Sequence, residues 1–184
     1  MYKERNEEKR REYLLGIAGI SEESRVYVDE SGVSEYLYRD HCYARRGVKI
    51  IGEISGKKFK RTNVIAGYIN HKTIAECVCD GNSDREFIES WVEGFLLKNL
   101  KKGQVVIWDN ASFHKSEKVK KMLEDVGCRL IFLPPYSPDL NPIEHFWANF
   151  KKWLRNHIST YNTLWDTIVA FFSLNSSRIN SKTA

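Results

Sequence analysis

The stretch VVIWDNASFHKSEKVKKMLEDVGCRLIFL, residues 105–133, decides the fold class of this chain. Its first three residues are β-branched and predict a buried strand. A helix is predicted from about Ser116 to Val126, and Gly127 is typical of the position where a helix ends. The run from Arg129 to Leu133 predicts a second strand. A strand, a helix and a strand in succession favour a sheet with helices packed on it.

Three more strands are predicted upstream of this stretch. The first is the β-branched and aromatic run 26–28, which ends at Asp29 before the turn-forming pair Ser31-Gly32. The other two cover 63–69 and 73–79, with a short polar connection between them. We expect these strands to form an antiparallel meander.

Helices are predicted between and after the strands. One begins after the capping pair Asn82-Ser83 and stops at 101–103, another starts at Asn141, and a last apolar helix covers about 164–174. The complete order is three strands, helix, strand, helix, strand and two helices. This order predicts an α/β fold with a mixed five-stranded sheet flanked by helices, the ribonuclease-H-like arrangement.

Length and composition place the chain among ordinary globular proteins. It has 184 residues, of which 42% are hydrophobic and 29% are charged. A domain of this size buries a core that is large enough to need no disulfides. The first residues are almost wholly polar, so residues 1–24 are expected to form an arm or linker helix and residues 25–184 the ribonuclease-H-like domain.

Cysteine spacing and hydropathy point to the cytoplasm. The four cysteines lack paired CxxC spacing and no N-terminal apolar segment resembles a signal peptide, so reduced thiols are expected. Cys77 and Cys79 would point to one face of a strand, where core packing explains them better than metal binding. No apolar run is long enough to span a membrane.

Positive charge is concentrated in a few segments. The 29 Lys and Arg residues exceed the 24 Asp and Glu residues, which gives a formal net charge of +5. Basic clusters suit a polyanion such as DNA, because each neutralised phosphate releases condensed counterions. Solvated lysines on surface loops explain the same charge equally well. The candidate DNA-binding residues are Arg45, Arg46, Lys58, Lys60, Arg61, Lys115, Lys151, Lys152 and Arg155.

Asp29 and Asp109 stand at the predicted ends of two apolar strands. An ionised carboxylate beside a buried strand is costly unless something pairs with it. Structural explanations stay open for both residues, since Asp29 could initiate a turn and Asp109 could form an Asx-turn. Both are also candidate metal ligands.

Glu144 has a structural explanation of its own. Asn141 as N-cap, Pro142 at the first helical position and Glu144 at the third would form a start that resembles a capping box. Glu144 also shares a helix face with Lys151 and Arg155, away from the apolar face, and is placed to meet a metal-bound phosphate. In phosphodiester chemistry, two Mg²⁺ ions about 3.5–4 Å apart activate the attacking oxygen and stabilise the leaving one, and they prefer hard oxygen ligands.

Three blocks of sequence carry a family resemblance. They are VYVDES at 26–31, WDNASFHK at 108–115 and LPPYSPDLNPIE at 133–144. Together they resemble the catalytic blocks of bacterial insertion-sequence transposases in the mariner-related DDE superfamily. The third block is long and specific, and 34 residues (110–143) separate the acids of the second and third blocks, as in that family. The resemblance spans about residues 25–155.

The resemblance implies the catalytic domain of a DNA transposase, in which Asp29, Asp109 and Glu144 are the catalytic residues and bind two Mg²⁺ or Mn²⁺ ions. The implied reaction is hydrolysis at transposon ends, followed by attack of the freed 3′-hydroxyl on target DNA. The expected partners are double-stranded DNA, as transposon ends and as target, and a second copy of the chain. The expected location is the cytoplasm of a bacterium, at the nucleoid.

Supporting roles follow from the same blocks. Asn110 and His114 would orient a ligand or contact phosphate, although a structural His114 that closes the turn is an equally good explanation. Tyr136 and the neighbouring prolines would shape the loop that presents the third acid. Glu30 and Asp139 would be bystanders.

Relatives of this kind usually carry helix-turn-helix modules ahead of the catalytic domain, whereas only residues 1–24 precede it here. The part that reads the transposon ends is therefore expected on a separate helix-turn-helix protein from an upstream reading frame, or the chain is a truncated remnant. Two other functions stay open. One is another ribonuclease-H-like nuclease, such as a resolvase or an RNA–DNA hybrid hydrolase, and the other is a catalytically inactive DNA-binding protein derived from a transposase.

Overall fold

The computed structural model of the chain describes residues 6–34, 46–47, 61–80, 84–111 and 114–180. The chain divides into two compact units. The first comprises Met1–Ser31 and Asn63–Ala148, and the second comprises Gly32–Thr62 and Asn149–Ala184. The predicted domain boundary after residue 24 stays a prediction.

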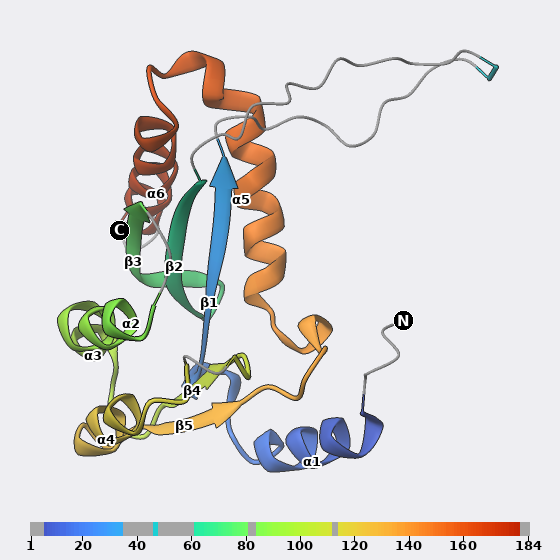
Figure 1. Cartoon of the computed structure of the whole chain (residues 1–184), viewed down its shortest axis with the longest axis vertical. Coiled ribbons are helices and arrows are strands. Elements are labelled where there is room, and N and C mark those ends of the chain that lie inside the picture. Colours follow the sequence, from blue (N-terminus) through green and yellow to red (C-terminus); the bar gives the residue numbers. More distant parts are fainter. Residues whose placement is uncertain (1–5, 35–45, 48–60, 81–83, 112–113, 181–184) are drawn as a thin grey trace. The chain divides into compact units, whose positions relative to one another are not determined.

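A five-stranded sheet has the order β3-β2-β1-β4-β5 (Figure 1). The strands are β1 (Arg25–Ser34), β2 (Arg61–Ile69), β3 (Lys72–Asp80), β4 (Val105–Trp108) and β5 (Arg129–Phe132). Strand β4 pairs in parallel with β1 on one side and with β5 on the other, so that Val106 lies opposite both Val26 and Leu130. All four residues of β4 are buried, as a parallel strand covered on both faces requires.

The connection between β2 and β3 is a tight turn. Asn70 and His71 have φ values of 50° and 60°. Two successive positive φ angles define the turn of a two-residue hairpin, and such a hairpin joins antiparallel strands. The predicted meander is confirmed for this pair. With the parallel pairs of β4, it makes the sheet mixed, as predicted.

The first strand is longer than predicted. Strand β1 continues through Ser31-Gly32 to Ser34, so Asp29 lies in the middle of a strand and does not initiate a turn. Arg61 lies beside this extension, and a Cβ placed on Gly32 would lie 1.8 Å from its Nε atom. Gly32 therefore permits a close approach of a side chain within the sheet.

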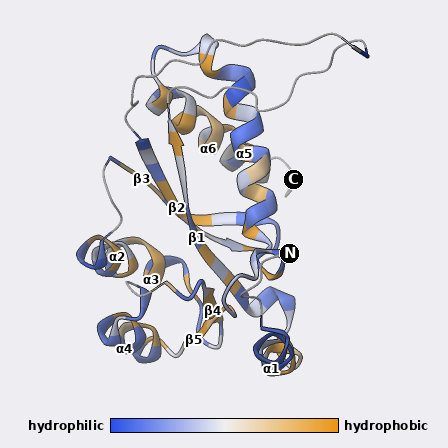
Figure 2. Cartoon of the chain, turned by 45° about the vertical axis from the view of Figure 1, so that its right-hand side comes forward, coloured by the Kyte–Doolittle hydropathy of each residue, from blue (hydrophilic) through white to orange (hydrophobic). Residues whose placement is uncertain are grey.

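One face of the sheet is covered by α2 (Arg85–Trp91), a π-helical turn (Val92–Leu96), α3 (Leu97–Asn99) and α4 (Glu117–Asp125). Their buried side chains, Trp91 and Leu123 among them, form one core cluster with Val28, Val106 and Trp108. In Figure 2 the outward side of α4 is hydrophilic. Its predicted start at Ser116 and its end before Gly127 are confirmed.

The helix start predicted at Asn82-Ser83 needs a correction. Helix α2 is capped by Asp84, whose side chain accepts a hydrogen bond from the Phe87 N–H at 2.8 Å. Aspartate is as good an N-cap as asparagine or serine, so the three neighbours compete for the position. Residues 82 and 83 lie outside the described residues.

The opposite face of β4 packs against the N-terminal helix. Helix α1 (Glu7–Ile17) buries Tyr13 and Ile17 in a second cluster with Val105 and Ile107. Because successive side chains of a strand point to opposite faces, these two residues alternate with Val106 and Trp108, which face the first cluster. One short strand thus connects both halves of the core.

The second unit contains the C-terminal helices. Helix α5 (Ile143–His157) begins in the first unit, and its later turns pack with α6 (Leu164–Asn180), which is longer than predicted. The ring centroids of Phe150 and Phe171 lie 5.0 Å apart, and those of Trp153 and Phe171 lie 5.3 Å apart. Aromatic pairs at these distances stabilise a helix pair. None of the described helices is long and apolar enough to cross a membrane.

Candidate active site

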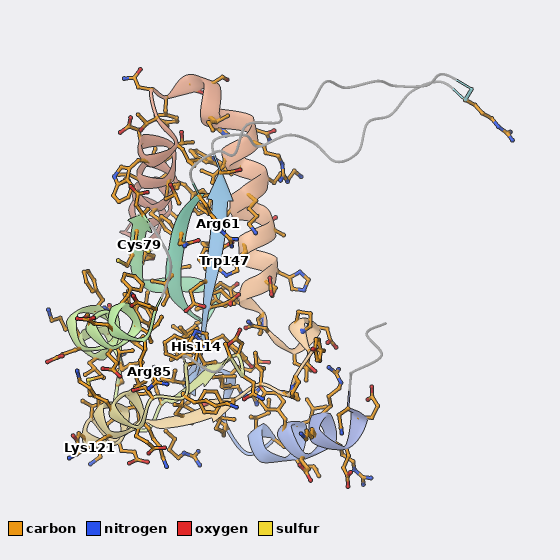
Figure 3. The ribbon with its side chains drawn as sticks, in the orientation of Figure 1. Arg61, Cys79, Arg85, His114, Lys121 and Trp147 are labelled. Carbon is orange, nitrogen blue, oxygen red and sulfur yellow. The ribbon has the colours of Figure 1, made fainter. Side chains whose placement is uncertain are left out.

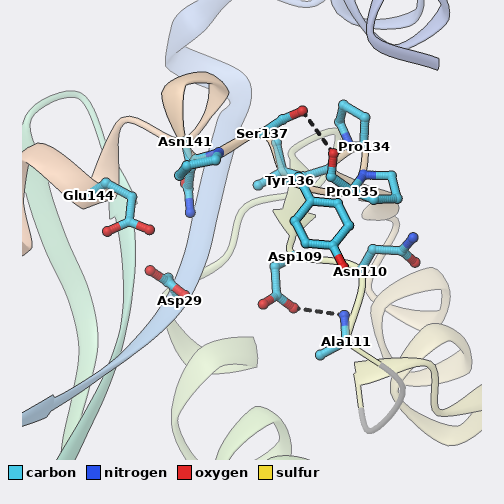
Figure 4. A pocket seen from close by; sticks show the side chains of 12 residues that line it. Asp29, Asp109, Asn110, Ala111, Pro134, Pro135, Tyr136, Ser137, Asn141 and Glu144 are labelled. Atoms are coloured by element: carbon cyan, nitrogen blue, oxygen red, sulfur yellow. Dashed lines mark hydrogen bonds between the residues drawn. The ribbon is translucent and has the colours of Figure 1, made fainter. Parts of the chain in front are cut away.

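A pocket of about 420 Å³ lies in the first unit, where β4 and β5 end. Its lining comes from β1, from the segments that follow β4 and β5, and from the start of α5 (Figure 4). All three predicted carboxylates, Asp29, Asp109 and Glu144, line this pocket. The carboxyl edge of a parallel sheet is where α/β proteins usually bind ligands. The fold therefore brings together three acids that are far apart in the sequence.

Asp29 is held by β1 and by a tryptophan. The indole N–H of Trp147 on α5, which is labelled in Figure 3, donates a hydrogen bond to Asp29 Oδ2, and the two atoms lie 3.1 Å apart. Burial, followed by the negative charges of Glu144 and Glu30, raises the pKa of the Asp29 carboxyl to about 8. In Figure 4 the carboxyl groups of Asp29 and Glu144 point toward one another. A cation between them would relieve this repulsion.

Asp109 is fixed by two donors on the turn that follows β4. Its Oδ1 accepts a hydrogen bond from the Ala111 N–H at 3.0 Å, which is the Asx-turn considered above, and it also contacts Nδ1 of His114. Although burial opposes ionisation, the bonds from His114 and Ala111 keep the pKa of Asp109 below its ordinary value. Both bonds use Oδ1, and in Figure 4 the other oxygen faces the side of the pocket where Asp29 lies.

His114 is a buried bridge between two acids. Its ring stacks on Trp108 at 4.5 Å, and its Nε2 lies 3.0 Å from Glu30 Oε1. Burial lowers the pKa of His114, but the hydrogen bonds with Asp109 and Glu30 outweigh burial and raise this pKa to about 9. The protonated ring therefore donates to both carboxylates. This geometry supports orientation of Asp109, whereas the side chain is too deeply buried to reach a phosphate.

Glu144 lies in the first turn of α5 and is exposed, while Ile143, Trp147 and Phe150 form the buried face as predicted. The capping explanation for this helix start is not borne out. The side-chain oxygen of Asn141 has no hydrogen-bond partner among the described residues, although it is buried. The start is held by backbone bonds, such as that from the Glu144 N–H to the Asn141 carbonyl at 3.1 Å.

The pocket offers the ligand types that a hard divalent cation prefers, namely carboxylate and amide oxygens. Asp29 and Glu144 face one another, and the buried carboxyl of Asp29 beside the negative charge of Glu144 favours a cation. Within the described part of the chain, no three His, Cys, Asp or Glu side chains are gathered closely enough to hold an ion in this conformation. The residues fit Mg²⁺ or Mn²⁺ in chemistry, and Asp109 has one oxygen engaged by its two donors and the other turned toward the side where Asp29 lies.

A loop between β5 and α5 forms the wall of the pocket. Tyr136 has a φ of 54° and is 53% exposed at the pocket, and Ser137 Oγ donates to the Pro135 carbonyl at 3.2 Å. Arg10 on α1 donates two hydrogen bonds to Asp139, at 3.0 and 2.7 Å. Asp139 is not among the residues that line the pocket. Its ion pair with Arg10 connects the loop to α1.

The remaining predicted residues are scattered. Asn110 is exposed at the edge of the pocket, and it also lines a neighbouring pocket of about 470 Å³ together with Lys115. Half-buried Lys151 lies on α5 in the second unit. The exposed basic candidates are Arg46, Arg61, Lys115, Lys152 and Arg155. The candidates Arg45, Lys58 and Lys60 lie outside the described residues.

Two contributors to the site escaped the sequence reasoning. Trp147 was assigned to the buried face of its helix, and Glu30 was expected to be a bystander, yet they contact Asp29 and His114 respectively. The sequence offered a partial signal only for Trp147, which follows Glu144 by three residues and so lies on an adjacent part of the helix surface. Alternation along the strand points Glu30 to the opposite face from Asp29 and gives no such signal.

Known proteins resemble this chain in sequence and in structure. The Tc1 transposase of Caenorhabditis elegans is 30% identical over 77 residues, which is 42% of this chain and 28% of that protein. A Mos1 strand transfer complex has a TM-score of 0.64 at 18% identity, over 97% of this chain and 62% of that one. The Mos1 transposase catalytic domain, in a structure with raltegravir and Mg, has a TM-score of 0.57 at 17% identity, over 94% of this chain and 92% of that one.

The predicted ribonuclease-H-like fold is therefore confirmed by the sheet order and by these structural similarities. The chain spans less than two thirds of the Tc1 transposase and of the Mos1 chain in the strand transfer complex. The family described as DDE superfamily endonuclease matches residues 24–164. This match includes all three acids of the pocket and most of the chain, and the chain therefore belongs to the DDE superfamily of endonucleases.

Proposed function

We propose that this chain is the catalytic domain of a DNA transposase, which cuts transposon ends and joins them to target DNA. One observation carries the proposal: Asp29, Asp109 and Glu144 line one pocket within the stretch that matches the DDE endonuclease family. Relatives named as transposases, Tc1 and Mos1, support the reaction class. We propose two Mg²⁺ or Mn²⁺ ions as cofactors, since a related catalytic domain contains Mg.

Two of the three carboxylates have a support that sets their position. The Trp147 indole holds Asp29 Oδ2, and His114 with the Ala111 N–H holds Asp109 Oδ1. When bound, the cations would activate the attacking oxygen and stabilise the leaving oxygen. The supports orient these two acids before the substrate arrives, so less ordering has to be done during the reaction.

The rim of the pocket suits a nucleic-acid strand. Tyr136 exposes an aromatic ring on which a base can stack, and the prolines beside it exclude water from one side. Lys115, in the neighbouring pocket, provides a positive charge for a phosphate. We propose that the DNA passes from this lysine to the carboxylates along Asn110, which lines both pockets.

The wider assembly belongs to the same proposal. A second copy of the chain and a helix-turn-helix protein from an upstream reading frame would read and pair the transposon ends of a bacterial insertion sequence. Residues 1–24, which include α1, would connect to this part, and the basic residues of α5 would contact DNA.

A cleavage assay tests the proposal. Labelled DNA that carries the ends of the element is incubated with the protein and Mg²⁺ or Mn²⁺, and a parallel reaction contains EDTA. Cleavage should depend on the metal and disappear in Asp109→Asn and Glu144→Gln. Asp125→Asn, at an exposed position on α4, is the matched control and should cleave as the wild type does.

The outcomes separate the candidate functions. Cleavage that persists in both acid variants would show that other residues do the chemistry. DNA binding without cleavage, with Mn²⁺ and added end-reading partner, would favour the inactive DNA-binding derivative. The observation that keeps this second function in play is that, among the described residues, no three acidic side chains are gathered closely enough to hold an ion.

A further inference from the structure

Asn141 is a buried polar residue at the site with an unused side-chain oxygen. Its side chain is part of the pocket lining, the residue is 4% exposed, and Oδ1 has no hydrogen-bond partner among the described residues. Its backbone, in contrast, is engaged on both sides. The N–H donates to the Pro138 carbonyl at 3.0 Å, and the carbonyl accepts from the Glu144 N–H at 3.1 Å. The backbone of Asn141 is therefore fixed by hydrogen bonds, whereas its side-chain oxygen accepts none from the described residues.

An unused buried polar group is costly. Leaving one without a partner costs about 1–3 kcal/mol, and native proteins satisfy nearly all of them. Asn141 lies just before α5, with Pro142 between them, where an asparagine side chain can cap the helix by accepting a backbone N–H. Figure 4 shows its side chain directed instead into the pocket, with the amide nitrogen toward the facing carboxyl groups of Asp29 and Glu144.

The chemistry of this position fits a cation. An amide oxygen is a hard ligand that suits Mg²⁺ or Mn²⁺, and a half-turn of the amide presents either its oxygen or its NH₂ group to the pocket. A third acid beside Asp29 and Glu144 would add repulsion, whereas a neutral amide adds a ligand without adding charge. The backbone bond between Asn141 and Glu144 keeps the two side chains on one turn.

We infer that Asn141 is an additional oxygen ligand for the divalent cation that Asp29 and Glu144 hold. This inference rests on the proposed function, because it takes from it the cation and the two acids. It assigns a purpose to the one buried polar atom of the pocket that the hydrogen-bond network of the described residues leaves unsatisfied.

Calorimetric titration of the protein with Mn²⁺, in the absence of DNA, tests the inference. Asn141→Leu keeps the size of the side chain and removes its polar atoms. It should weaken Mn²⁺ binding by about tenfold or more, in the range that loss of a supporting group costs a metal site. Its melting temperature in EDTA should be unchanged or higher by about 2–4 °C, since an unsatisfied buried group is gone.

Two further variants sharpen the result. Asn141→Asp restores an oxygen and should recover Mn²⁺ binding to at least the wild-type level. Asn149→Leu makes the same change at an exposed position of α5 and should leave Mn²⁺ binding unaltered. If Asn141→Leu does not fold, the comparison is made with Asn141→Ser, whose shorter side chain should also weaken binding.

Opposite outcomes overturn the inference. Wild-type affinity for Mn²⁺ in Asn141→Leu, or a loss of several degrees in melting temperature with unchanged affinity, would show a purely structural asparagine. Asp29→Asn separates this failure from that of the proposed function. If Asp29→Asn loses Mn²⁺ binding and Asn141→Leu does not, only the role of Asn141 fails. If the wild type does not bind Mn²⁺, both fail.

Discussion

Replacement of Asp29 by asparagine should stabilise the metal-free protein at alkaline pH. Asp29 is buried on β1, faces Glu144 and has Glu30 as its neighbour, and together these raise its pKa to about 8. In the unfolded chain the same carboxyl titrates near 4. Between these two pH values the folded state therefore binds one proton more than the unfolded state does.

The sign of the effect follows from this difference in protons. The contribution of Asp29 to stability is fully present below about pH 4 and is lost as the pH rises toward 8. The interval from 3.8 to about 8 sets an upper limit of about 6 kcal/mol. Relaxation and entry of water reduce such penalties, so we expect about 2–4 kcal/mol, or on the order of 5–10 °C in melting temperature.

Thermal unfolding in EDTA from pH 4 to pH 9 measures this effect. Asp29→Asn should have the same melting temperature as the wild type at pH 4, and a melting temperature that exceeds that of the wild type by a growing margin up to pH 8. Asp125→Asn, at an exposed position, should have a melting temperature close to that of the wild type throughout. Addition of Mn²⁺ at pH 8 should raise the melting temperature of the wild type and not that of Asp29→Asn. Parallel pH profiles of wild type and Asp29→Asn in EDTA would refute the crowding of carboxylates from which the metal site is argued.

Four other changes probe the supports of the site. His114→Gln removes a fully buried ring between two acids and should lower the free energy of unfolding by about 2–3 kcal/mol in urea. Trp147→Phe keeps an aromatic ring but removes the N–H donor to β1, and should cost about 1 kcal/mol in the same measurement. A double-mutant cycle of Arg10→Met and Asp139→Asn should give a coupling of about 1 kcal/mol, because the acid is 54% exposed. Lys115→Gln should reduce the salt dependence of DNA binding, measured by fluorescence anisotropy, by about one counterion.

The strands and helices were predictable because their patterns are local. Strand β4 is a run of four buried residues. Helix α4 is bounded in the sequence by its capping residue Ser116 and by Gly127. The end of β1 was not predictable in this way. The pair Ser31-Gly32 favours a turn locally, but β1 continues beyond its last pair with β4, at Val28, on the side where β2 is its neighbour, and the side chain of Arg61 occupies the space beside the glycine. Pairing across the sheet overrode local propensity.

The three acids were predictable from motifs, but their supports were not. The contact between His114 and Glu30 joins residues 84 positions apart, and that between Trp147 and Asp29 joins residues 118 positions apart. No periodicity or turn signal encodes such pairs, since they depend on how β1, α5 and the turn after β4 meet. A strong motif thus points to the proposed ligands, whereas the folded chain decides what orients them.

Structural and functional explanations for these acids turn out not to compete. The Asx-turn of Asp109 engages Oδ1, and the same residue directs its other oxygen to the pocket, so the turn is a means of aiming the carboxylate. His114 likewise closes the turn through its backbone, by a bond to the Ala111 carbonyl at 3.2 Å, and supports Asp109 through its ring. A residue that serves both purposes can be replaced only at a cost to both. For that reason His114→Gln should lower stability and metal-dependent cleavage together, whereas Asn141→Leu should lower Mn²⁺ binding without lowering stability.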